Sequence, residues 1–323
     1  MKTRSIVLLI VAGALILVGA AVALGAVLSM NFDFKEMNTM TFTEKTYNID
    51  EAFDSISVDG VECDVLLIPS TDSECKVVCN ESDKITHTVE VEDSTLTVKR
   101  HDERKWYQRM GIYWGKMEIK VYLPEGDYSS LDITTLSGNV EVPEEYSFGE
   151  AEIYNTSGNV SISAAVKGTL SVKTVSGEQK IRNAAPEKLN LRSTSGDIEV
   201  SSANSVSDIK LETVSGSIEI EDAVCRSITA ASTSGEITLE RVTAEADIDI
   251  KTTSGEVELN RSDAASLKIV TVSGDVSGTL LTEKAFITDT VSGDVNVPRT
   301  ASQNICEIKT TSGSIDFETV TND

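Results

Sequence analysis

A Ser-Gly pair recurs ten times between Ser137 and Gly313, and successive glycines are 19 or 20 residues apart. Such a short fixed period is typical of one supersecondary unit repeated along the chain, and not of a globular domain folded around distant contacts. The repeat therefore restricts the fold class more than any other feature of the sequence. The ten pairs are Ser137-Gly138, Ser157-Gly158, Ser176-Gly177, Ser195-Gly196, Ser215-Gly216, Ser234-Gly235, Ser254-Gly255, Ser273-Gly274, Ser292-Gly293 and Ser312-Gly313.

Apolar residues alternate with polar ones on both sides of the glycine in most repeats. This period of two predicts two short strands joined by a turn, because neighbouring side chains of a strand point to opposite faces. The pairs after the glycine are Val140 and Val142, Ile198 and Val200, Ile218 and Ile220, Ile237 and Leu239, Val257 and Leu259, Val295 and Val297, and Ile315 and Phe317. The pairs before it are Leu131 and Ile133, Leu189 and Leu191, Ile209 and Leu211, Ile248 and Ile250, and Leu267 and Ile269. Gln179 and Gly278 break this pattern, and we expect a local weak spot at each.

The pattern predicts an all-β fold, a parallel β-solenoid (β-helix) of about ten coils of 19–20 residues. Stacking at about 4.8 Å would give a rod on the order of 48 Å long. We expect each glycine at a corner where φ is positive or a Cβ would clash, and a hydrogen bond from the preceding serine to nearby backbone. The position three residues before each glycine continues the inward face, and it predicts a ladder of hydroxyls that satisfy one another between coils. This row is Thr135, Asn155, Thr174, Ser193, Thr213, Ser232, Thr252, Thr271, Thr290 and Thr310.

Residues 53–125 lack the Ser-Gly period but show the same alternation, for example at Val58, Val65, Val98 and Val121. A terminal coil would otherwise expose unpaired strand edges, so we interpret this segment as a β-rich N-terminal cap. The predicted organisation is a cytoplasmic stub (1–5), a transmembrane signal-anchor helix (6–30), a linker (31–52), the cap (53–125) and the solenoid (126–323).

The N-terminus predicts export and a membrane anchor. Lys2 and Arg4 precede an uninterrupted apolar run from Ile6 to Leu28, which is long enough to cross a bilayer core of about 30 Å as a helix. The charge distribution places the N-terminus inside and the solenoid outside the cell membrane, as a single-pass protein. A signal peptide cleaved near Ala21-Val22-Ala23, with release of the protein, stays open as the alternative.

The net charge of −24 excludes nucleic acid and anionic lipid headgroups as partners of the bulk of the protein. The simplest interpretation of this acidity is solubility and protection of strand edges. The cysteines are Cys63, Cys75, Cys79, Cys225 and Cys306, too few for a disulfide scaffold and without zinc-type spacing. A disulfide between Cys63 and Cys79 and buried free thiols both stay open.

The repeats contain no histidine, because His87 and His101 precede them, and this argues against catalysis. The residue after the Ser-Gly pair is often acidic, which allows either a carboxylate row that attracts Ca²⁺ or solvated turn residues. These acids are Glu178, Asp197, Glu236, Glu256, Asp275 and Asp294. The calcium-binding nonapeptide pattern is not matched, so we expect no metal site. Because the repeats also lack a catalytic group of residues, we expect no enzyme activity and no cofactor.

One segment departs from the acidic composition. Between Lys99 and Lys120 there are seven basic and three acidic residues, together with both tryptophans of the chain. Basic and aromatic residues together suit a membrane interface or an anionic wall polymer, while the alternative is a hairpin loop whose aromatic residues cover the cap. The candidate ligand or membrane contacts are Arg104, Lys105, Trp106, Tyr107, Arg109, Tyr113 and Trp114.

Runs such as Thr194-Ser195-Gly196-Asp197-Ile198-Glu199-Val200 resemble a bacterial family of putative adhesins, a domain of unknown function with Ser-Gly-Asp solenoid repeats. The lead-in Ser57-Val58-Asp59-Gly60 is also similar, and the resemblance covers about Phe53 to Phe317. Some relatives resemble accessory proteins of envelope-stress operons in Gram-positive bacteria, anchored by one N-terminal helix, and the resemblance implies the same type of protein here. The resemblance implies the architecture, and it brings no catalytic residues.

We therefore expect a non-enzymatic, membrane-anchored, extracytoplasmic β-solenoid that acts in adhesion, envelope interaction or stress response. Its partners would be the membrane, through the N-terminal helix, and an envelope protein, lipid or wall polymer. The alternative is a polysaccharide-binding protein or degraded polysaccharide lyase that uses the flat face of the solenoid as a platform. The oligomeric state, the partner and the coil cross-section do not follow from the sequence.

Overall fold

The computed structural model describes residues 41–71, 74–106, 117–204 and 207–320, together with residues 16, 18–22, 24, 25 and 28. Most of the predicted anchor at 6–30 lies outside these residues. Within the described part of the chain, no helix has the length and apolar character needed to cross a membrane. The described chain separates into two compact units, and the larger one (45–79, 87–100 and 117–323) contains the repeats.

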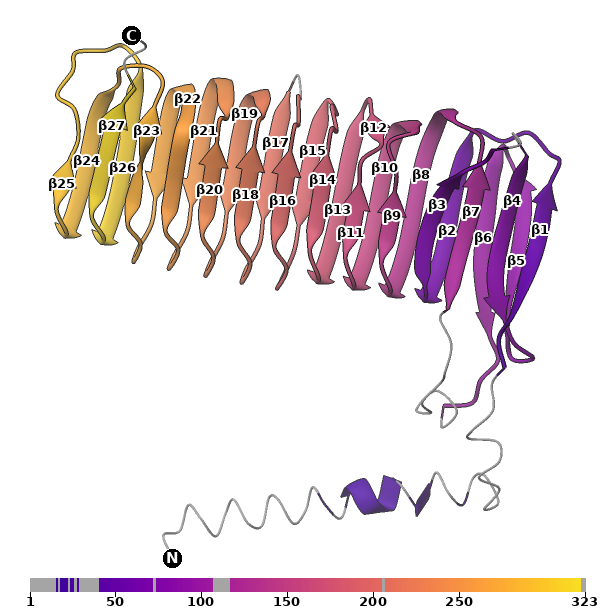
Figure 1. The fold of residues 1–323 in the computed structure, drawn as a ribbon. Helices are drawn as coiled ribbons and strands as arrows, with labels where there is room; N and C mark the ends of the chain where they lie inside the picture. The colour runs from indigo at the N-terminus through magenta and orange to yellow at the C-terminus, as the bar shows by residue number, and fades with distance from the viewer. Residues whose placement is uncertain are drawn as a thin grey trace, which may run out of the picture. The chain divides into compact units, whose positions relative to one another are not determined.

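Two sets of strands run through the larger unit (Figure 1). The strands that precede the Ser-Gly pairs form one sheet, which we call the leading sheet, and the strands that follow them form the other, which we call the trailing sheet. The leading sheet contains β2 (Ser55–Glu62), β6 (Thr95–Asp102), β8 (Gly126–Ser137), β10 (Tyr146–Ser157), β12 (Ala165–Val166), β13 (Thr169–Ser176), β15 (Lys188–Arg192), β17 (Asp208–Glu212), β19 (Val224–Ala231), β21 (Thr243–Lys251), β24 (Ala285–Ser292) and β26 (Ile305–Ser312). The trailing sheet contains β3 (Asp64–Pro69), β4 (Cys75–Glu81), β7 (Glu118–Leu123), β9 (Val140–Val142), β11 (Val160–Ile162), β14 (Gln179–Arg182), β16 (Ile198–Ser201), β18 (Ile218–Glu221), β20 (Ile237–Glu240), β23 (Val276–Leu280), β25 (Val295–Asn296) and β27 (Ile315–Thr319). The long strand β22 (Val257–Val270) contributes to both, and β1 (Thr43–Ile49) and β5 (Ile85–Glu92) complete the list.

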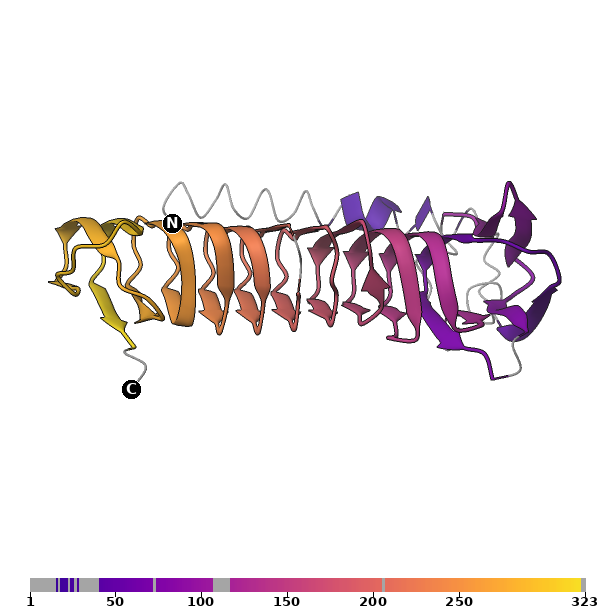
Figure 2. The same ribbon diagram turned by 90° about the horizontal axis from the view of Figure 1, so that it is seen from above.

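Equivalent strands of successive repeats pair in parallel, so the predicted parallel β-solenoid is confirmed, with about nine turns. The register is direct: Ile198 lies opposite Ile218, which lies opposite Ile237. The alternating apolar residues point inward and are buried along the length of the coils, as in Val160, Val200 and Leu259. Figure 2 shows the same coils from above, each stacked directly on its neighbour.

A second corner, where the trailing strand ends, uses left-handed backbone in residues other than glycine in five repeats. Six residues after the glycine, five successive repeats have φ between 50° and 54°. A small or branched buried side chain follows directly, for example Ala184 after Asn183 and Val242 after Arg241. Left-handed conformation is strained for most residues, so this corner stores free energy that the stacking must offset. The five residues are Asn183, Ser202, Asp222, Arg241 and Arg261.

At both ends of the solenoid, the order of the coils in space differs from their order in the sequence. In the leading sheet β2 lies between β6 and β8, and β3 lies between β7 and β9 in the trailing sheet. At the other end, β26 lies between β22 and β24, and β27 lies between β23 and β25. The last coil of the sequence is therefore inserted, and the coil of Gly293 is the outermost one (Figure 1).

A buried lysine fixes the segment that crosses to this outermost coil. The Lys284 side chain is 1% exposed and forms an ion pair with Asp263 of β22. Its Nζ also donates to Thr282 Oγ1 at 2.6 Å, and its carbonyl oxygen accepts a hydrogen bond from Thr300 Oγ1. The charge is thus paired and hydrogen-bonded, as a buried charge must be.

The two breaks in the apolar pattern are accommodated differently. Gln179 is fully buried, and its Nε2 donates to Thr174 Oγ1 and to the Arg192 carbonyl oxygen, both at 2.8 Å, while its Oε1 has no partner. Gly278 lies opposite Phe317, whose large ring is buried and contacts Phe286 at a centroid distance of 5.8 Å. A large neighbour on the same ladder therefore compensates for the missing side chain.

None of the five cysteines, all of which the structure describes, is in a disulfide, so Cys63 and Cys79 are not bonded to each other. Burial raises the pKa of Cys63, Cys225 and Cys306 to about 12 and that of the half-buried Cys75 to about 11. These side chains are protonated thiols at neutral pH, and they behave as small apolar groups.

Candidate interaction surface

The Ser-Gly corners form one continuous edge, because each glycine stacks directly on that of the adjoining coil. A Cβ at Gly216 would overlap the carbonyl oxygen of Gly196, and a Cβ at Gly255 would overlap that of Gly235. At Gly138, Gly158 and Gly177 the backbone also has φ of 129°, 128° and 114°. Glycine is needed here for close backbone approach and, in those three coils, for the backbone conformation.

The row three residues before the glycine points inward, as predicted, but it bonds mainly to backbone. Thr213 Oγ1 donates to the Gly196 carbonyl oxygen at 3.2 Å, and Ser232 Oγ donates to that of Gly216 at 3.1 Å. Only Thr174 bonds to the next hydroxyl of the row, that of Ser193, among the described residues. The prediction that the hydroxyls satisfy one another is therefore wrong for most of the row: five hydroxyls donate to backbone carbonyl oxygens, and Thr252 Oγ1 and Thr271 Oγ1 have no partner among the described residues.

The residue after the glycine also caps its neighbour. Asp197 Oδ1 accepts a hydrogen bond from the Ser217 amide, and Asp275 Oδ1 accepts one from the Ser314 amide, both at 2.8 Å. Asn159 Oδ1 accepts one from the Glu178 amide at 3.0 Å. These side chains hold backbone N–H groups at the corner. Among the described residues, no three Asp, Glu, His or Cys side chains are grouped so that they could hold a metal ion.

The outermost part of the edge is a row of exposed, uncharged side chains two residues before each glycine, which we call the uncharged stripe. Its apolar members are 46–82% exposed, and threonine occupies the remaining coils. An outward-facing serine follows each of them. The stripe consists of Leu136, Thr156, Val175, Thr194, Val214, Thr233, Thr253, Val272, Val291 and Thr311. Exposed apolar side chains that recur along one edge make this edge a candidate interaction site.

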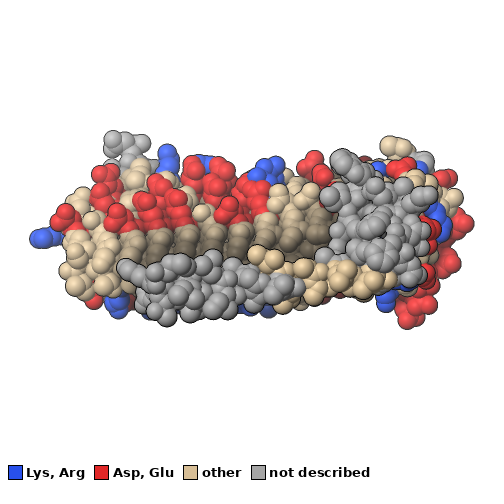
Figure 3. Space-filling model, turned by 90° about the horizontal axis from the view of Figure 1, so that it is seen from below, with Lys and Arg blue, Asp and Glu red and all other residues tan. Residues whose placement is uncertain are grey.

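Charged residues flank the stripe on its leading side. A groove of about 480 Å³ on this side is lined by Arg192, Glu212, Lys251 and stripe threonines. There Arg192 Nε lies 2.8 Å from Glu212 Oε2, and hydrogen bonds from Lys210 and Arg192 lower the pKa of Glu212 against the effect of burial. Figure 3 shows Asp and Glu gathered along one side of the solenoid.

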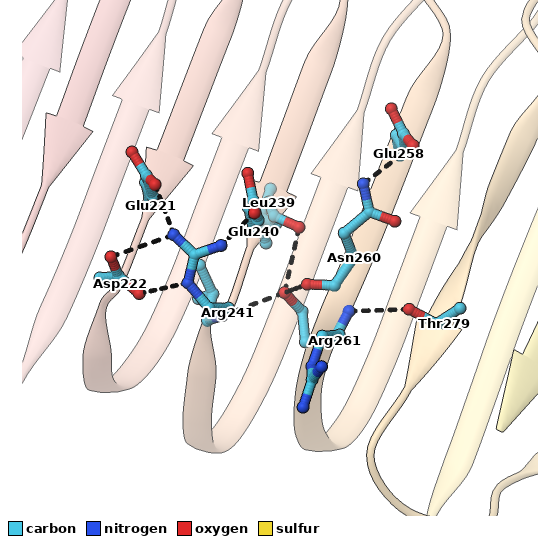
Figure 4. Close-up of polar contacts among 11 residues, drawn as sticks. Glu221, Asp222, Leu239, Glu240, Arg241, Glu258, Asn260, Arg261 and Thr279 are labelled. Atoms are coloured by element: carbon cyan, nitrogen blue, oxygen red, sulfur yellow. Dashed lines mark hydrogen bonds and ion pairs between the residues drawn. The ribbon is translucent and has the colours of Figure 1, made fainter. Parts of the chain in front are cut away.

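At the second corner, where the trailing strands end far from the stripe, carboxylates gather around Arg241 (Figure 4). Arg241 Nε lies 2.6 Å from Asp222 Oδ1, and its other nitrogens contact Glu221 and Glu240. The hydrogen bond from Arg241 lowers the pKa of Asp222, and the pKa of Arg241 is raised above its usual range. One arginine thus balances only part of the local negative charge, so the second corner favours cationic and disfavours anionic partners.

The basic and aromatic loop is described only in part, in the smaller unit. Trp106 is 53% exposed and Lys105 is exposed. Arg104 is buried instead, and its guanidinium contacts Asp102 through two hydrogen bonds, at 2.9 and 2.7 Å. It therefore presents no unpaired charge to a ligand. The other candidate contacts, Tyr107, Arg109, Tyr113 and Trp114, lie outside the described residues.

The sequence interpretation did not single out the uncharged stripe. The signal was present in the residue before each Ser-Gly pair, which is leucine, valine or threonine in all ten repeats. Strict alternation would place only every second residue outside. At the corner, two consecutive residues face solvent, Val214 and Ser215 for example, because the backbone turns there.

A search of curated proteins gives no significant match. Among solved structures, a putative lipid binding protein from Parabacteroides distasonis is 20% identical, with a TM-score of 0.49, over 74% of this chain and 97% of its own. A putative adhesin from Parabacteroides merdae is 15% identical, with a TM-score of 0.49, over 86% of this chain and 96% of its own. A putative adhesin from Bacteroides fragilis is 17% identical, with a TM-score of 0.44, over 86% of this chain and 97% of its own. The family described as Toastrack DUF4097 matches residues 53–247 and 202–322, so the chain belongs to this family.

Proposed function

We propose that this Toastrack protein is a non-enzymatic, membrane-anchored binding protein of the cell envelope, of adhesin type, which holds its partner along the uncharged stripe. The observation that carries the proposal is the stripe itself, ten side chains without a charge on a protein of net charge −24. Exposed valines are unfavourable in water, so a contact that covers them gains free energy. The rigid stacking presents them at a fixed spacing.

Anchoring rests on the N-terminal sequence. The run from Ile6 to Leu28 has the length of a membrane-spanning helix, and Lys2 and Arg4 place its start in the cytoplasm. Fractionation of cells and protease treatment of intact cells test this. A membrane-bound chain whose solenoid is accessible from outside supports the proposal, while a cleaved and released chain supports the secreted alternative.

The stripe is tested by replacing Val175, Val214 and Val272 with lysine in the full chain. All three side chains are 46–48% exposed, so the fold tolerates the change. The matched control replaces Ser171, Asn190 and Thr229 with lysine on the leading sheet, which adds the same charge away from the stripe. In a deletion strain, adhesion of cells to surfaces and survival of envelope-directed antibiotics are measured after complementation.

We expect the stripe variant to behave like the deletion and the control to behave like the wild type. Wild-type behaviour of the stripe variant would remove the stripe from the proposal. A deletion strain with unchanged adhesion and antibiotic survival would contradict the adhesin-type role as a whole.

The exposed end of the basic loop is a second contact candidate, for envelope lipid or wall polymer. Its support is the exposed Trp106 beside Lys105. The test replaces Trp106, Arg109 and Trp114 with alanine and measures binding to envelope lipid vesicles and to purified wall polymer. Unchanged binding by a folded variant would exclude this contact.

Polysaccharide binding is the alternative function, and the serine and threonine hydroxyls along the stripe favour it. Binding of the protein to a glycan array, lost in the stripe variant, would support it. Neutralising Asp197 and Asp275 is a poor test, because both carboxylates hold backbone amides of the next coil. Asp294 is the better choice within that row.

A further inference from the structure

The outermost coil at the end opposite the N-terminal cap has an open edge in both sheets. In the described chain, β24 pairs only with β26, and β25 pairs only with β27. The Ala285 amide donates to the Asn304 carbonyl oxygen, on the inner side. Because amides alternate in direction along a strand, those of Phe286, Thr288 and Thr290 point away from the solenoid. A row of unpaired backbone groups of this kind is a template for another strand.

The apolar interior is also open at this end. Val295 is 45% exposed, whereas Val276 and Ile315, at the same ladder position in the two nearest coils, are fully buried. Ile287, on the outer face of β24, is 54% exposed. A hollow of about 830 Å³ at the end of the coil is lined by Phe286, Val295 and Val297 together with polar residues such as Thr288 and Arg299. Ladder positions that are buried in the inner coils are therefore partly exposed at this end, beside polar groups.

The usual protection of an edge strand is weak here. β24 has eight residues, and none of them is lysine, arginine or proline. Its single charge is Asp289. Natural edge strands of this length are normally shortened, bulged or charged, so an uncovered β24 would invite association.

We propose that the β24–β25 edge is the interface of a two-fold, tail-to-tail dimer, in which a second copy of this chain covers it. A two-fold axis perpendicular to the sheets places β24 antiparallel to β24 of the copy, and β25 antiparallel to its equivalent. One operation thus extends both sheets and covers both open interiors at once. At the N-terminal end, β4 pairs antiparallel with β7 and also pairs with β1, so the trailing sheet continues past its last coil and stacking head to tail cannot extend both sheets.

The charges at the edge agree with the antiparallel arrangement. Asp294 precedes β25 and Arg299 follows it, and both side chains are exposed. The two-fold axis exchanges the two ends of the strand, so Asp294 of one copy faces Arg299 of the other, twice in the dimer. A parallel arrangement would place like charges side by side.

The test measures the mass of the full chain in detergent by light scattering, over a range of concentrations. We expect a dimer for the wild type. Ile287→Lys and Thr288→Pro should each give monomers: the first places a charge on the interface, and the second removes an amide that points to the copy. Lys268 occupies the position equivalent to Ile287 in the coil of Gly274, so lysine is compatible with the coil. Val272→Lys, on the stripe, is the matched control and should remain dimeric.

A charge exchange separates this interface from association through the N-terminal segment. Asp294→Arg and Arg299→Asp should each weaken the dimer several-fold, because each creates two contacts between like charges. Mixing the two variants, or combining them in one chain, should restore it. A monomeric wild type, a persistent dimer in Ile287→Lys and Thr288→Pro, or no restoration by the exchange would each overturn the proposal.

Discussion

The middle coils and the C-terminal end coils of this solenoid are built from the same repeat, but their places in the stack are fixed differently. In the middle, each coil lies beside its sequence neighbours, for example β16 between β14 and β18. At the C-terminal end, the coil of Gly313 lies inside that of Gly293. In the middle, the order of the coils along the chain is sufficient to fix their order in the stack. At the ends, contacts specific to the end coils must fix it.

The strongest test of this difference is the buried ion pair at the crossing segment. Lys284→Met leaves Asp263 buried without its partner, and we expect a loss of about 3–5 kcal/mol in the free energy of unfolding of the end coils. In the middle, Arg192→Met removes an exposed ion pair with Glu212 and should cost about 0–1 kcal/mol. Urea denaturation followed by circular dichroism measures both.

Removing both charges controls for the ion pair itself. In Lys284→Met with Asp263→Asn no buried charge remains, so most of the loss should be recovered. A loss in Lys284→Met no larger than that in Arg192→Met would show that the ion pair does not hold the crossing segment.

The stacked glycines of the Ser-Gly corners, here called the glycine spine, give the next largest effect. Gly235→Ala forces a Cβ onto the Gly216 carbonyl oxygen, and we expect a loss of about 1–3 kcal/mol or more, as for overpacking in a core. Gly126→Ala is the control, because a Cβ there meets nothing within 4 Å. It should be neutral or stabilise by roughly 0.4–1 kcal/mol. Equal denaturation midpoints of the two variants would contradict a steric role for the spine.

Thiol labelling compares the opening of the two regions directly. Cys225 lies in the middle and Cys306 in the inserted end coil, and burial raises the pKa of both to about 12. Their intrinsic reactivities are therefore similar, and the labelling rate reports how often each site opens. We expect Cys306 to react faster, since only one coil separates it from the open end of the solenoid, whereas Cys225 lies several coils away from either end. Equal rates, read by mass spectrometry of the digested protein, would indicate one cooperative unit.

The smallest predicted effect concerns the left-handed corner. Arg261→Gly removes the cost of a positive φ of 50°, offset by the greater freedom of glycine in the unfolded chain, and should stabilise by about 0.5–1 kcal/mol. Arg241→Gly should gain less, because it also loses its contacts with Glu221, Asp222 and Glu240. A larger gain at Arg241 than at Arg261, measured by thermal unfolding, would mean that those contacts are unimportant.

The repeat period predicted the solenoid, the two strands per coil and the inward ladders, because these depend on local spacing alone. It did not predict the exchange at the ends, since the coils of Gly293 and Gly313 carry the same Ser-Gly signal. The left-handed corner was also missed. Asn183, Ser202, Asp222, Arg241 and Arg261 share a backbone conformation but no side-chain chemistry.

For the candidate surface, alternation identified which residues of a strand face outward but failed at the turn, where two consecutive residues do. The uncharged stripe lies at that turn. The partner of the inward hydroxyls depended on where the glycine carbonyls of the adjoining coil point, and this follows from the stacking of coils, not from the sequence of one coil.

The inserted end coil also has a consequence for how the protein is made. Strands β24 and β25 leave the ribosome before β26 and β27, yet their strand partners in the described chain are those two strands. Neither has its final position until β26 and β27 have been synthesised. A chain that stops before β26 loses that coil and also the place where the preceding coil docks. The order of synthesis and the order of docking are therefore reversed at this end of the solenoid.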